Sequence, residues 1–222
     1  MARPNTFMKI PTERVGALIG PNGVTKKTIE SKLSVEIQID GETGGVTVTL
    51  AENATDPSML FRAKDVITAL GRGFSPEHAF RLLRDEDAIL DVLDLRTVFG
   101  RSETDIKRVN GRIIGANGKT RRIIEELTNS NVAVYGHTVS IIGTIEEAEV
   151  AREAIQMLVR GSMHSNVYRF LHRKRRELKK KMLELWEKPP EEKQKQASTG
   201  EKRKSRRSQK TRKLNARATR RI

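Results

Sequence analysis

The chain has no cysteine among its 222 residues, which excludes disulfides, thiolate metal sites and cysteine nucleophiles. Aromatic residues make up only 4% of it, which argues against a surface that stacks successive bases on aromatic rings. It has no run of 18 apolar residues, so we predict no transmembrane helix. The first residues, 1–5, lack the apolar run of a signal peptide. We therefore expect a cytoplasmic protein without membrane contact.

Catalytic and metal-binding patterns are also missing. The histidines are scattered through the chain, at His78, His137, His164 and His172. The acidic residues between 85 and 94 do not have the spacing of a metal-binding loop. No HD pair or DEDD pattern supports a nuclease. We therefore predict no catalytic residues, no metal site and no cofactor.

Positive charge, in contrast, is abundant and unevenly placed. The formal net charge is +15, which favours a polyanionic partner. Residues 189–222 carry a net +10 and residues 162–188 a net +6, whereas residues 1–161 carry −1. The folded part of the chain must therefore bind a polyanion through a local patch.

One short motif occurs twice, as L-I-G-P-N-G at 18–23 and I-I-G-A-N-G at 113–118. Each copy has two apolar residues before a G-x-N-G loop, and a helical pattern follows. A single G-x-x-G would carry little information. Two copies with the same flanks, 95 residues apart, indicate an internal duplication.

The predicted order of elements repeats around the two loops. In the first unit we expect a strand at 6–10, helices from 12 and over 24–33, strands at 35–39 and 46–50, and a helix opened by Asp56 as N-cap and Pro57 as first helical residue. In the second we expect a strand within 89–95, a helix capped by Ser102, a helix at 119–129, strands near 132–134 and 139–142, and a helix with a Thr144–Glu147 capping box. A connector with one short helix at 76–83 joins them. This repetition favours two α+β units over one doubly wound sheet.

The C-terminal part is more basic. A helix is predicted from 165 to 188, and its apolar residues Phe170, Leu171 and Leu178 are expected to pack on the second unit, the alternative being a partner-binding helix. Past Pro189 the chain is almost free of apolar residues and reads as a disordered basic tail. The predicted division is 1–73, 74–88, 89–161, 162–188 and 189–222: first unit, connector, second unit, basic helix and tail.

Several segments together resemble a known family. They are V-x-x-L-I-G-P-N-G at 15–23, G-F-S-P-E-H-A-F-R-L-L at 73–83, G-R-I-I-G-A-N-G-K-T-R-R-I-I-E-E-L-T at 111–128 and N-V-Y-R-F-L-H-R-K-R-R-E-L at 166–178. They are similar to the archaeal family of small-ribosomal-subunit assembly proteins with two type I KH domains, which is related to the eukaryotic pre-ribosomal factor called partner of Nob. The resemblance covers roughly residues 6–178.

The resemblance implies a function and partners. It implies binding to the single-stranded 3′ end of small-subunit ribosomal RNA within the pre-ribosomal small subunit. It also implies contact with the endonuclease that matures this end and, more weakly, with the alpha subunit of translation initiation factor two. We expect the protein itself to be a monomer.

The residue types around the loops fit RNA binding. Glycines let the backbone approach phosphates closely, the next helix presents its N-terminus, apolar residues receive bases and cations complete the rim. The candidates at the second loop are Arg108, Arg112, Ile114, Gly115, Ala116, Asn117, Gly118, Lys119, Arg121 and Arg122. The weaker candidates at the first loop are Ile19, Gly20, Pro21, Asn22, Gly23, Lys26 and Lys27, with Arg14 one turn earlier.

We rank the second loop above the first because its flanks carry more cations. Base contacts are expected along the strand 132–135, where Tyr135 adds a candidate contact. Two other interpretations stay open for the first loop: a plain turn between helices, or an adaptor surface that docks a protein. As an alternative function for the whole chain, a KH adaptor would bind mainly protein and RNA only incidentally.

Overall fold

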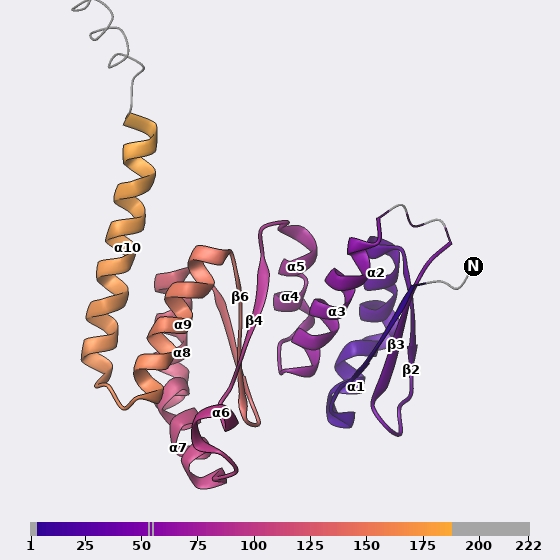
Figure 1. Cartoon of the computed structure of the whole chain (residues 1–222), viewed down its shortest axis with the longest axis horizontal. Coiled ribbons are helices and arrows are strands. Elements are labelled where there is room, and N and C mark those ends of the chain that lie inside the picture. The colour runs from indigo at the N-terminus through magenta and orange to yellow at the C-terminus, as the bar shows by residue number, and fades with distance from the viewer. Residues whose placement is uncertain (1–3, 53, 55, 188–222) are drawn as a thin grey trace, which may run out of the picture. The chain divides into compact units, whose positions relative to one another are not determined.

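The computed structural model describes residues 4–52, 54 and 56–187 and has two units with the same order of elements (Figure 1). The first unit comprises β1 (Asn5–Lys9), α1 (Thr12–Ile19), α2 (Val24–Leu33), β2 (Val35–Ile39), β3 (Gly45–Leu50) and α3 (Ser58–Gly71). The second comprises β4 (Ile89–Asp94), α6 (Arg96–Phe99), α7 (Glu103–Ile114), α8 (Lys119–Thr128), β5 (Asn131–Tyr135), β6 (Thr138–Gly143) and α9 (Ile145–Val159). The predicted α+β class and the duplication are confirmed, and the tail prediction for 189–222 lies outside the described residues.

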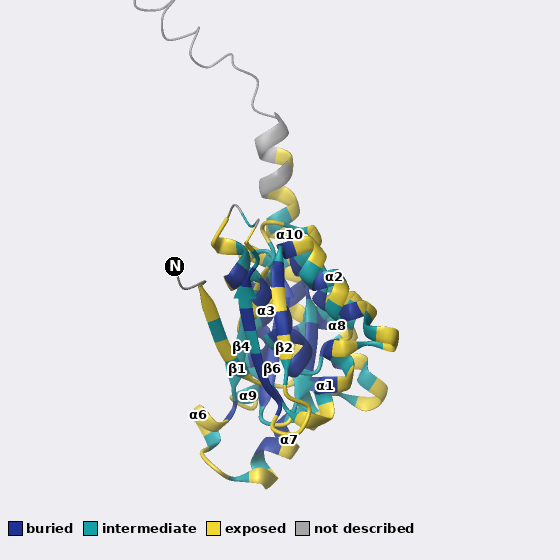
Figure 2. Cartoon of the chain, turned by 90° about the vertical axis from the view of Figure 1, so that its right-hand side faces the viewer, coloured by how far each residue is buried: buried dark blue, intermediate teal, exposed yellow. Residues whose placement is uncertain are grey.

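Each unit has one antiparallel sheet of three strands, ordered β1-β3-β2 and β4-β6-β5. In the first sheet Ile37 pairs with Val48, and in the second Val132 pairs with Ile141. The predicted alternation is plain in β2, where buried and exposed residues follow one another (Figure 2). In the first sheet the branched side chains of β2 and β3 lie on one face, and the helices cover that face.

The duplication extends to individual contacts at a constant offset of 95 residues. Glu30 accepts a hydrogen bond from the Ile37 amide at 2.9 Å, and Glu125 accepts one from the Val132 amide at 2.8 Å. In both units this carboxylate ties the helix after the loop to the edge strand. The C-cap residue that follows this helix, Ser34 or Asn129, has a left-handed conformation in each case.

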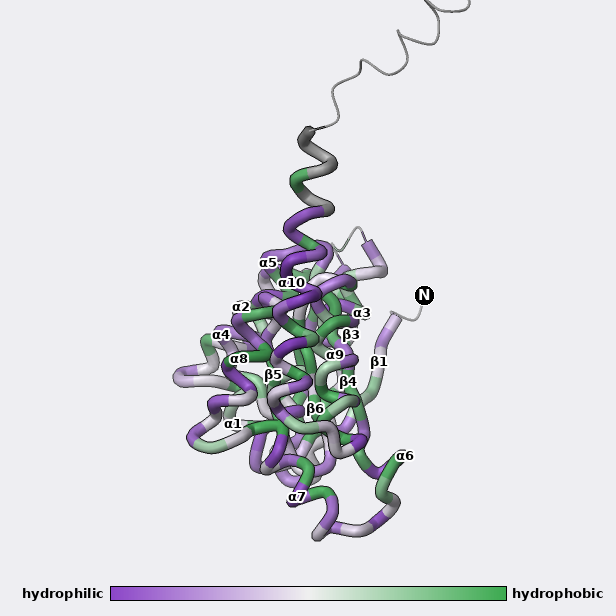
Figure 3. Tube along the Cα trace, turned by 90° about the vertical axis from the view of Figure 1, so that its left-hand side faces the viewer, coloured by the Kyte–Doolittle hydropathy of each residue, from purple (hydrophilic) through white to green (hydrophobic). Residues whose placement is uncertain are grey.

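The second sheet is covered on both faces along its central strand. Its strand β6 is buried at every position. Ile141 belongs to the core of the second unit, whereas its neighbour Ile142 belongs to the core of the first, together with Phe74 and Leu82. Figure 3 shows hydrophobic stretches along β4 and β6. The first unit and the connector therefore cover the face of the second sheet that its own helices leave open.

A polar contact reinforces this junction. The Arg81 guanidinium donates to the Asn129 carbonyl at 2.6 Å and to the Glu147 carboxylate at 2.6 Å. Glu147 also closes the predicted capping box with Thr144, which the structure confirms. The Glu147 carboxylate thus caps the N-terminus of α9 and also accepts a hydrogen bond from Arg81 of the connector.

The connector differs from the prediction of one helix at 76–83. It forms two short helices, α4 (Pro76–Ala79) and α5 (Arg81–Arg84), separated at Phe80. Phe74, Ala79 and Leu82 are buried in the first core. Packing of these apolar residues, rather than continuous helical hydrogen bonding, shapes this segment.

Two predicted helix caps also behave differently. Ser102 occupies the N-cap of α7, but its hydroxyl donates to the Asp105 carboxylate at 2.7 Å and caps no backbone amide. The described α3 begins at Ser58, one residue later than predicted, while Asp56 accepts a hydrogen bond from the Ser58 amide at 2.8 Å. Hydrogen bonds from the Ser58 hydroxyl and amide lower the pKa of Asp56.

The helix α10 (His164–Glu187) follows α9. The chain separates into one compact body, residues 1–175, which contains both units, and a second segment from residue 176 onward. Within the first of these, Val167, Phe170 and Leu171 are buried in the second core. The predicted packing on the second unit is therefore confirmed for Phe170 and Leu171, whereas Leu178 is half-buried and does not belong to this core.

Candidate nucleic-acid interface

The two glycine loops have the same backbone conformation. Gly20 has φ 70° and ψ 174°, and Gly115 has φ 71° and ψ 175°. Asn22 and Asn117 both lie in the left-handed region, with φ of 53° and 51°. Asparagine tolerates this region better than most residues do. Each loop therefore turns the chain sharply between two helices in the same way.

The first glycine of each loop is required by packing. A Cβ atom on Gly20 would collide with the Thr25 side chain, and one on Gly115 would collide with Thr120. Both threonines are buried. This threonine, which no sequence pattern marked, fixes the base of each loop.

The last glycine of each loop faces open space. Gly23 and Gly118 have φ of 74°; no atom lies within 4 Å of a Cβ built on Gly23, and only the Arg122 guanidinium, from 3.8 Å, approaches one on Gly118. The helices α2 and α8 start directly after these glycines, with neither a side-chain cap nor an acidic residue in the first turn. Their N-termini are therefore accessible to a phosphate.

The apolar residues before the loops are partly exposed beside the loops, as predicted from the sequence. Ile19 and Ile114 are 39% and 37% exposed, although each follows a fully buried neighbour, Leu18 or Ile113. A large apolar side chain that stays half-exposed beside a polar loop can receive an unstacked base. Both units offer such a surface.

We call each glycine loop, together with the helices that flank it, a clamp. Residues 95 positions apart show where the two clamps differ in charge. Arg108, Arg112 and Lys119 of the second unit correspond to Glu13, Ala17 and Val24 of the first. The basic pair after each loop is retained, as Lys26 and Lys27 in the first unit and Arg121 and Arg122 in the second. The second clamp therefore has three more cations and one carboxylate fewer.

The cations of the second clamp have different surroundings. The Arg108 side chain is 70% exposed and pairs with Asp105 at 3.0 Å. Lys119 is exposed. Arg121 lies 4.0 Å from Glu125. The Arg122 guanidinium donates to the Asn117 carbonyl at 2.7 Å, so this arginine holds the loop itself.

Arg112 also connects the second clamp to the start of α10. Its guanidinium donates to the Ser162 carbonyl at 2.6 Å, and its own carbonyl lies 3.0 Å from the His164 ring nitrogen. The Tyr168 hydroxyl lies 3.0 Å from the Thr120 hydroxyl, under the loop. A hollow of about 440 Å³ lies between the loop and α10. Its lining includes Arg108, Arg112, Lys119, Thr120, His164 and Tyr168. The start of α10 therefore supports the second clamp, which the sequence did not reveal.

At the first clamp the exposed charge is smaller than predicted. Arg14 points away from the loop: its guanidinium donates to the Leu70 carbonyl at 2.9 Å and to the Phe74 carbonyl at 2.5 Å. Lys26 pairs with Glu30 at 3.7 Å. Lys27 is exposed. Arg14 is therefore a structural residue that joins α1 to the end of α3.

Tyr135 is also engaged within the protein. Its hydroxyl donates to the Glu13 carboxylate at 3.1 Å, and the Arg14 guanidinium lies 6.0 Å from its ring centroid. Burial, followed by this hydrogen bond to Glu13, raises the pKa of the Tyr135 phenol. Tyr135 therefore forms a contact between the two units, and its base contact stays a prediction.

Neither a cluster of metal-ligating side chains nor a membrane-spanning helix occurs in the part of the chain that the structure describes. There, no three His, Asp or Glu side chains come together as a metal site would require. No helix within the described ranges is long and apolar enough to cross a membrane.

Residues 89–176 match the family described as eukaryotic type KH-domain (KH-domain type I), and residues 5–68 match the KH domain family. The KH domain-containing protein MJ0443 of Methanocaldococcus jannaschii is 46% identical over 182 residues, which are 82% of this chain and 79% of that protein. The chain therefore belongs to the family of archaeal proteins with two KH domains.

Two further matches extend the family. The pre-rRNA-processing protein PNO1 of Coccidioides immitis is 27% identical over 164 residues, 74% of this chain and 64% of that protein. The chain thus spans just under two thirds of this eukaryotic relative. The crystal structure of an a/eIF2alpha–aDim2p–rRNA complex from Pyrococcus horikoshii OT3 contains a chain with 44% identity and a TM-score of 0.74; the match covers 79% of this chain and 96% of that chain.

Proposed function

We propose that this protein is an RNA-binding assembly factor of the small ribosomal subunit and binds the single-stranded 3′ end of its ribosomal RNA. The observation that carries the proposal is the second clamp, with an open glycine backbone, a free helix N-terminus and a cationic rim. The related aDim2p chain has been crystallised with rRNA and a/eIF2alpha. A relative named for pre-rRNA processing supports the same role.

The second clamp contributes most of the RNA affinity in this proposal. Arg108, Arg112, Lys119, Arg121 and Arg122 surround it, and each contact with a phosphate strengthens binding at low salt. Ile114 provides the apolar floor beside Gly115, Ala116, Asn117 and Gly118. The first clamp, with Ile19, Gly20, Pro21, Asn22, Gly23, Lys26 and Lys27, is the weaker RNA site. Its proline lacks a backbone N–H, which leaves one donor fewer for phosphates.

The first KH domain is then available to a protein. The alpha subunit of initiation factor two and the endonuclease that matures the RNA end are the proposed partners. In this role the protein has no catalytic activity of its own. It works in the cytoplasm as a monomer and brings the RNA end and its partners together.

The test is a binding measurement with three RNAs of equal length. One carries the 3′-end sequence of the small-subunit ribosomal RNA, one is a shuffled version and one is the same sequence in a duplex. We expect the full-length protein to prefer the first by at least about tenfold at physiological salt, because base contacts add to phosphate contacts. Equal affinity for the three would contradict the proposal and favour the adaptor function.

A further inference from the structure

The second unit contains an insertion that the clamp does not explain. In the first unit β1 ends at Lys9 and α1 begins at Thr12, whereas in the second β4 ends at Asp94 and α7 begins at Glu103. The inserted segment forms α6 and the turn that leads into α7. The helix α7 has 12 residues, compared with 8 in α1. The extra residues build a second hollow at the far end of α7 from the loop.

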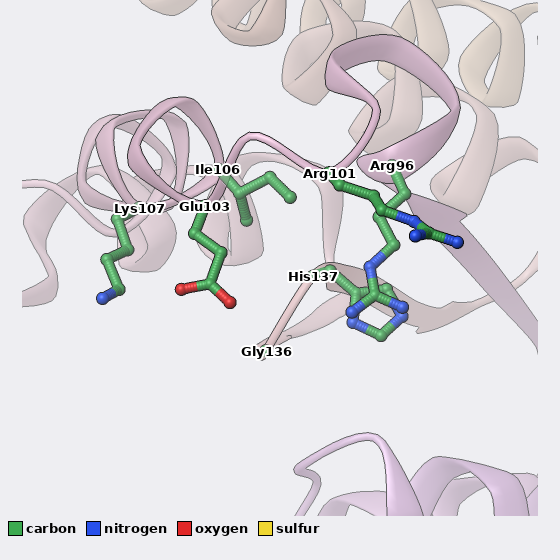
Figure 4. A pocket seen from close by; sticks show the side chains of 7 residues that line it. All are labelled: Arg96, Arg101, Glu103, Ile106, Lys107, Gly136 and His137. Atoms are coloured by element: carbon green, nitrogen blue, oxygen red, sulfur yellow. The ribbon is translucent and has the colours of Figure 1, made fainter.

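This hollow is a cationic cavity of about 590 Å³ (Figure 4). Arg96 and Arg101 come from the inserted segment, Lys107 from α7 and His137 from the turn between β5 and β6. In Figure 4 Arg96, Arg101 and His137 lie on one side and Lys107 on the other. Four groups that can donate hydrogen bonds to an anion therefore line one cavity.

The cavity has unneutralised positive charge. Within the described residues, Arg96, Arg101 and Lys107 make no side-chain hydrogen bond or ion pair. One carboxylate, that of Glu103, also lines the cavity. His137 lies 3.9 Å from the Asp94 carboxylate outside the lining. The three permanent cations thus exceed the one lining carboxylate.

The cavity and the second clamp share one rigid support. Lys107 and Gly115 lie on or directly after the same helix, roughly 12 Å apart along its axis at 1.5 Å per residue. The Asn110 amide donates to the Gly136 carbonyl at 2.8 Å, which holds the β5–β6 turn against α7. A single strand leaving the clamp along α7 reaches the cavity within a few nucleotides.

We propose that this cavity binds a backbone phosphate of the same RNA strand that the second clamp holds, and so extends the RNA path along α7. The inference rests on the proposed function. Guanidinium groups bind phosphate oxygens in a bidentate manner. The lining contains no Phe, Tyr or Trp ring, and its one ring, the His137 imidazole, lies 3.9 Å from the Asp94 carboxylate. The contact is therefore to the backbone and independent of sequence.

The experiment compares two RNAs that share one sequence. The shorter has about four nucleotides, the length a Gly-x-x-Gly clamp holds, and the longer extends this sequence at both ends. The double variant Arg96→Gln/Arg101→Gln of the full-length protein should bind the shorter RNA like the wild type. For the longer RNA we expect about three- to tenfold weaker binding at low salt and a salt slope smaller by about 0.7 for each lost phosphate contact.

The double variant Lys32→Gln/Lys64→Gln removes the same charge from exposed positions of the first unit and should leave both affinities unchanged. The variant Lys107→Gln probes the cavity from α7 and should repeat the selective loss. An equal loss for both RNAs would show a general field effect, and no loss for the longer RNA would show that the strand does not enter the cavity; either overturns the proposal. Failure of the proposed function is distinguishable, because the wild type would then bind the shorter ribosomal RNA no better than a shuffled RNA of the same length.

Discussion

At the residue scale, a buried threonine shapes each clamp from below. Thr25 and Thr120 lie under the first glycine of their loops. The Thr120 hydroxyl also shares a hydrogen bond with the Tyr168 hydroxyl. Within the described residues, Thr25 makes no such bond. The two loops have the same backbone, but the second is anchored more firmly.

The two glycines of the second loop should respond differently to alanine. Gly115→Ala combines a left-handed φ with a collision against Thr120, whereas Gly118→Ala has the φ cost alone, about 1–2 kcal/mol. We expect Gly115→Ala to lower the free energy of unfolding by about 3 kcal/mol, measured by urea denaturation. Equal losses for the two variants would contradict the assigned role of Thr120.

The Tyr168 hydroxyl should matter for RNA binding, although it is placed behind the loop. We expect Tyr168→Phe to cost about 1 kcal/mol of stability and to weaken RNA binding severalfold, because Thr120 loses its anchor. The matched control is Tyr135→Phe, which removes the hydroxyl that contacts Glu13 and should leave RNA affinity unchanged. Titrations with a fluorescent RNA measure the affinity of both variants. A larger loss of RNA affinity for Tyr135→Phe than for Tyr168→Phe would contradict the role assigned to Tyr168.

Arg121 and Arg122 should act through phosphates. Alanine at either position should weaken binding to every RNA sequence to a similar extent and reduce the salt slope by about 1. For Arg122 the loop contact to Asn117 disappears as well, so its loss of affinity should be the larger. Selective loss for one base at one position would instead indicate base readout.

At the element scale, local signals predicted most of the fold. The alternation of apolar and polar residues predicted β2, and the Thr144–Glu147 capping box predicted the start of α9. Both signals depend only on residues that are close in sequence. Arg14 and Tyr135 could not be placed in this way. The partners of Arg14 are 56 and 60 residues away, and Tyr135 meets Glu13 across 122 residues. Their basic and aromatic character fits RNA equally well, so only the tertiary structure decides between the roles.

The connector helix α5 should determine how the two units hold together. Arg81→Met removes the donor to Asn129 and Glu147 at a site where both charged side chains are largely buried, 23% and 17% exposed. We expect a loss of about 1–3 kcal/mol by urea denaturation. Arg152→Met removes an ion pair to Asp91 whose arginine is 43% exposed and should cost less than about 1 kcal/mol. A larger effect of the second variant would contradict the role of Arg81.

At the scale of the whole molecule, the net positive charge and the predicted site lie in different parts of the chain. The tail from 189 onward, outside the described residues, carries +10. Its deletion should leave Tm unchanged and lower affinity for arbitrary RNA at low salt. The ratio of specific to non-specific binding should stay the same; if that ratio falls, the tail takes part in recognition.

The whole-molecule arrangement also shows what the sequence could not reveal about the site. The loop residues and their ranking followed from the motif and its charges. The support of the second clamp by α10 and the cavity beside α6 did not, because both depend on side chains from separate elements meeting in space. Lys107 and His137, for example, are 30 positions apart and carry no shared motif.

The most direct measurement of the central claim compares the two clamps within the full-length protein. Gly118→Asp/Lys119→Asp places negative charge where the second clamp would hold phosphate, and Gly23→Asp/Val24→Asp does the same at the equivalent positions of the first. With RNA of the ribosomal 3′ end, the change at the second clamp should weaken binding at least about tenfold more than the change at the first. An equal or reversed loss would contradict the assignment of RNA binding to the second clamp.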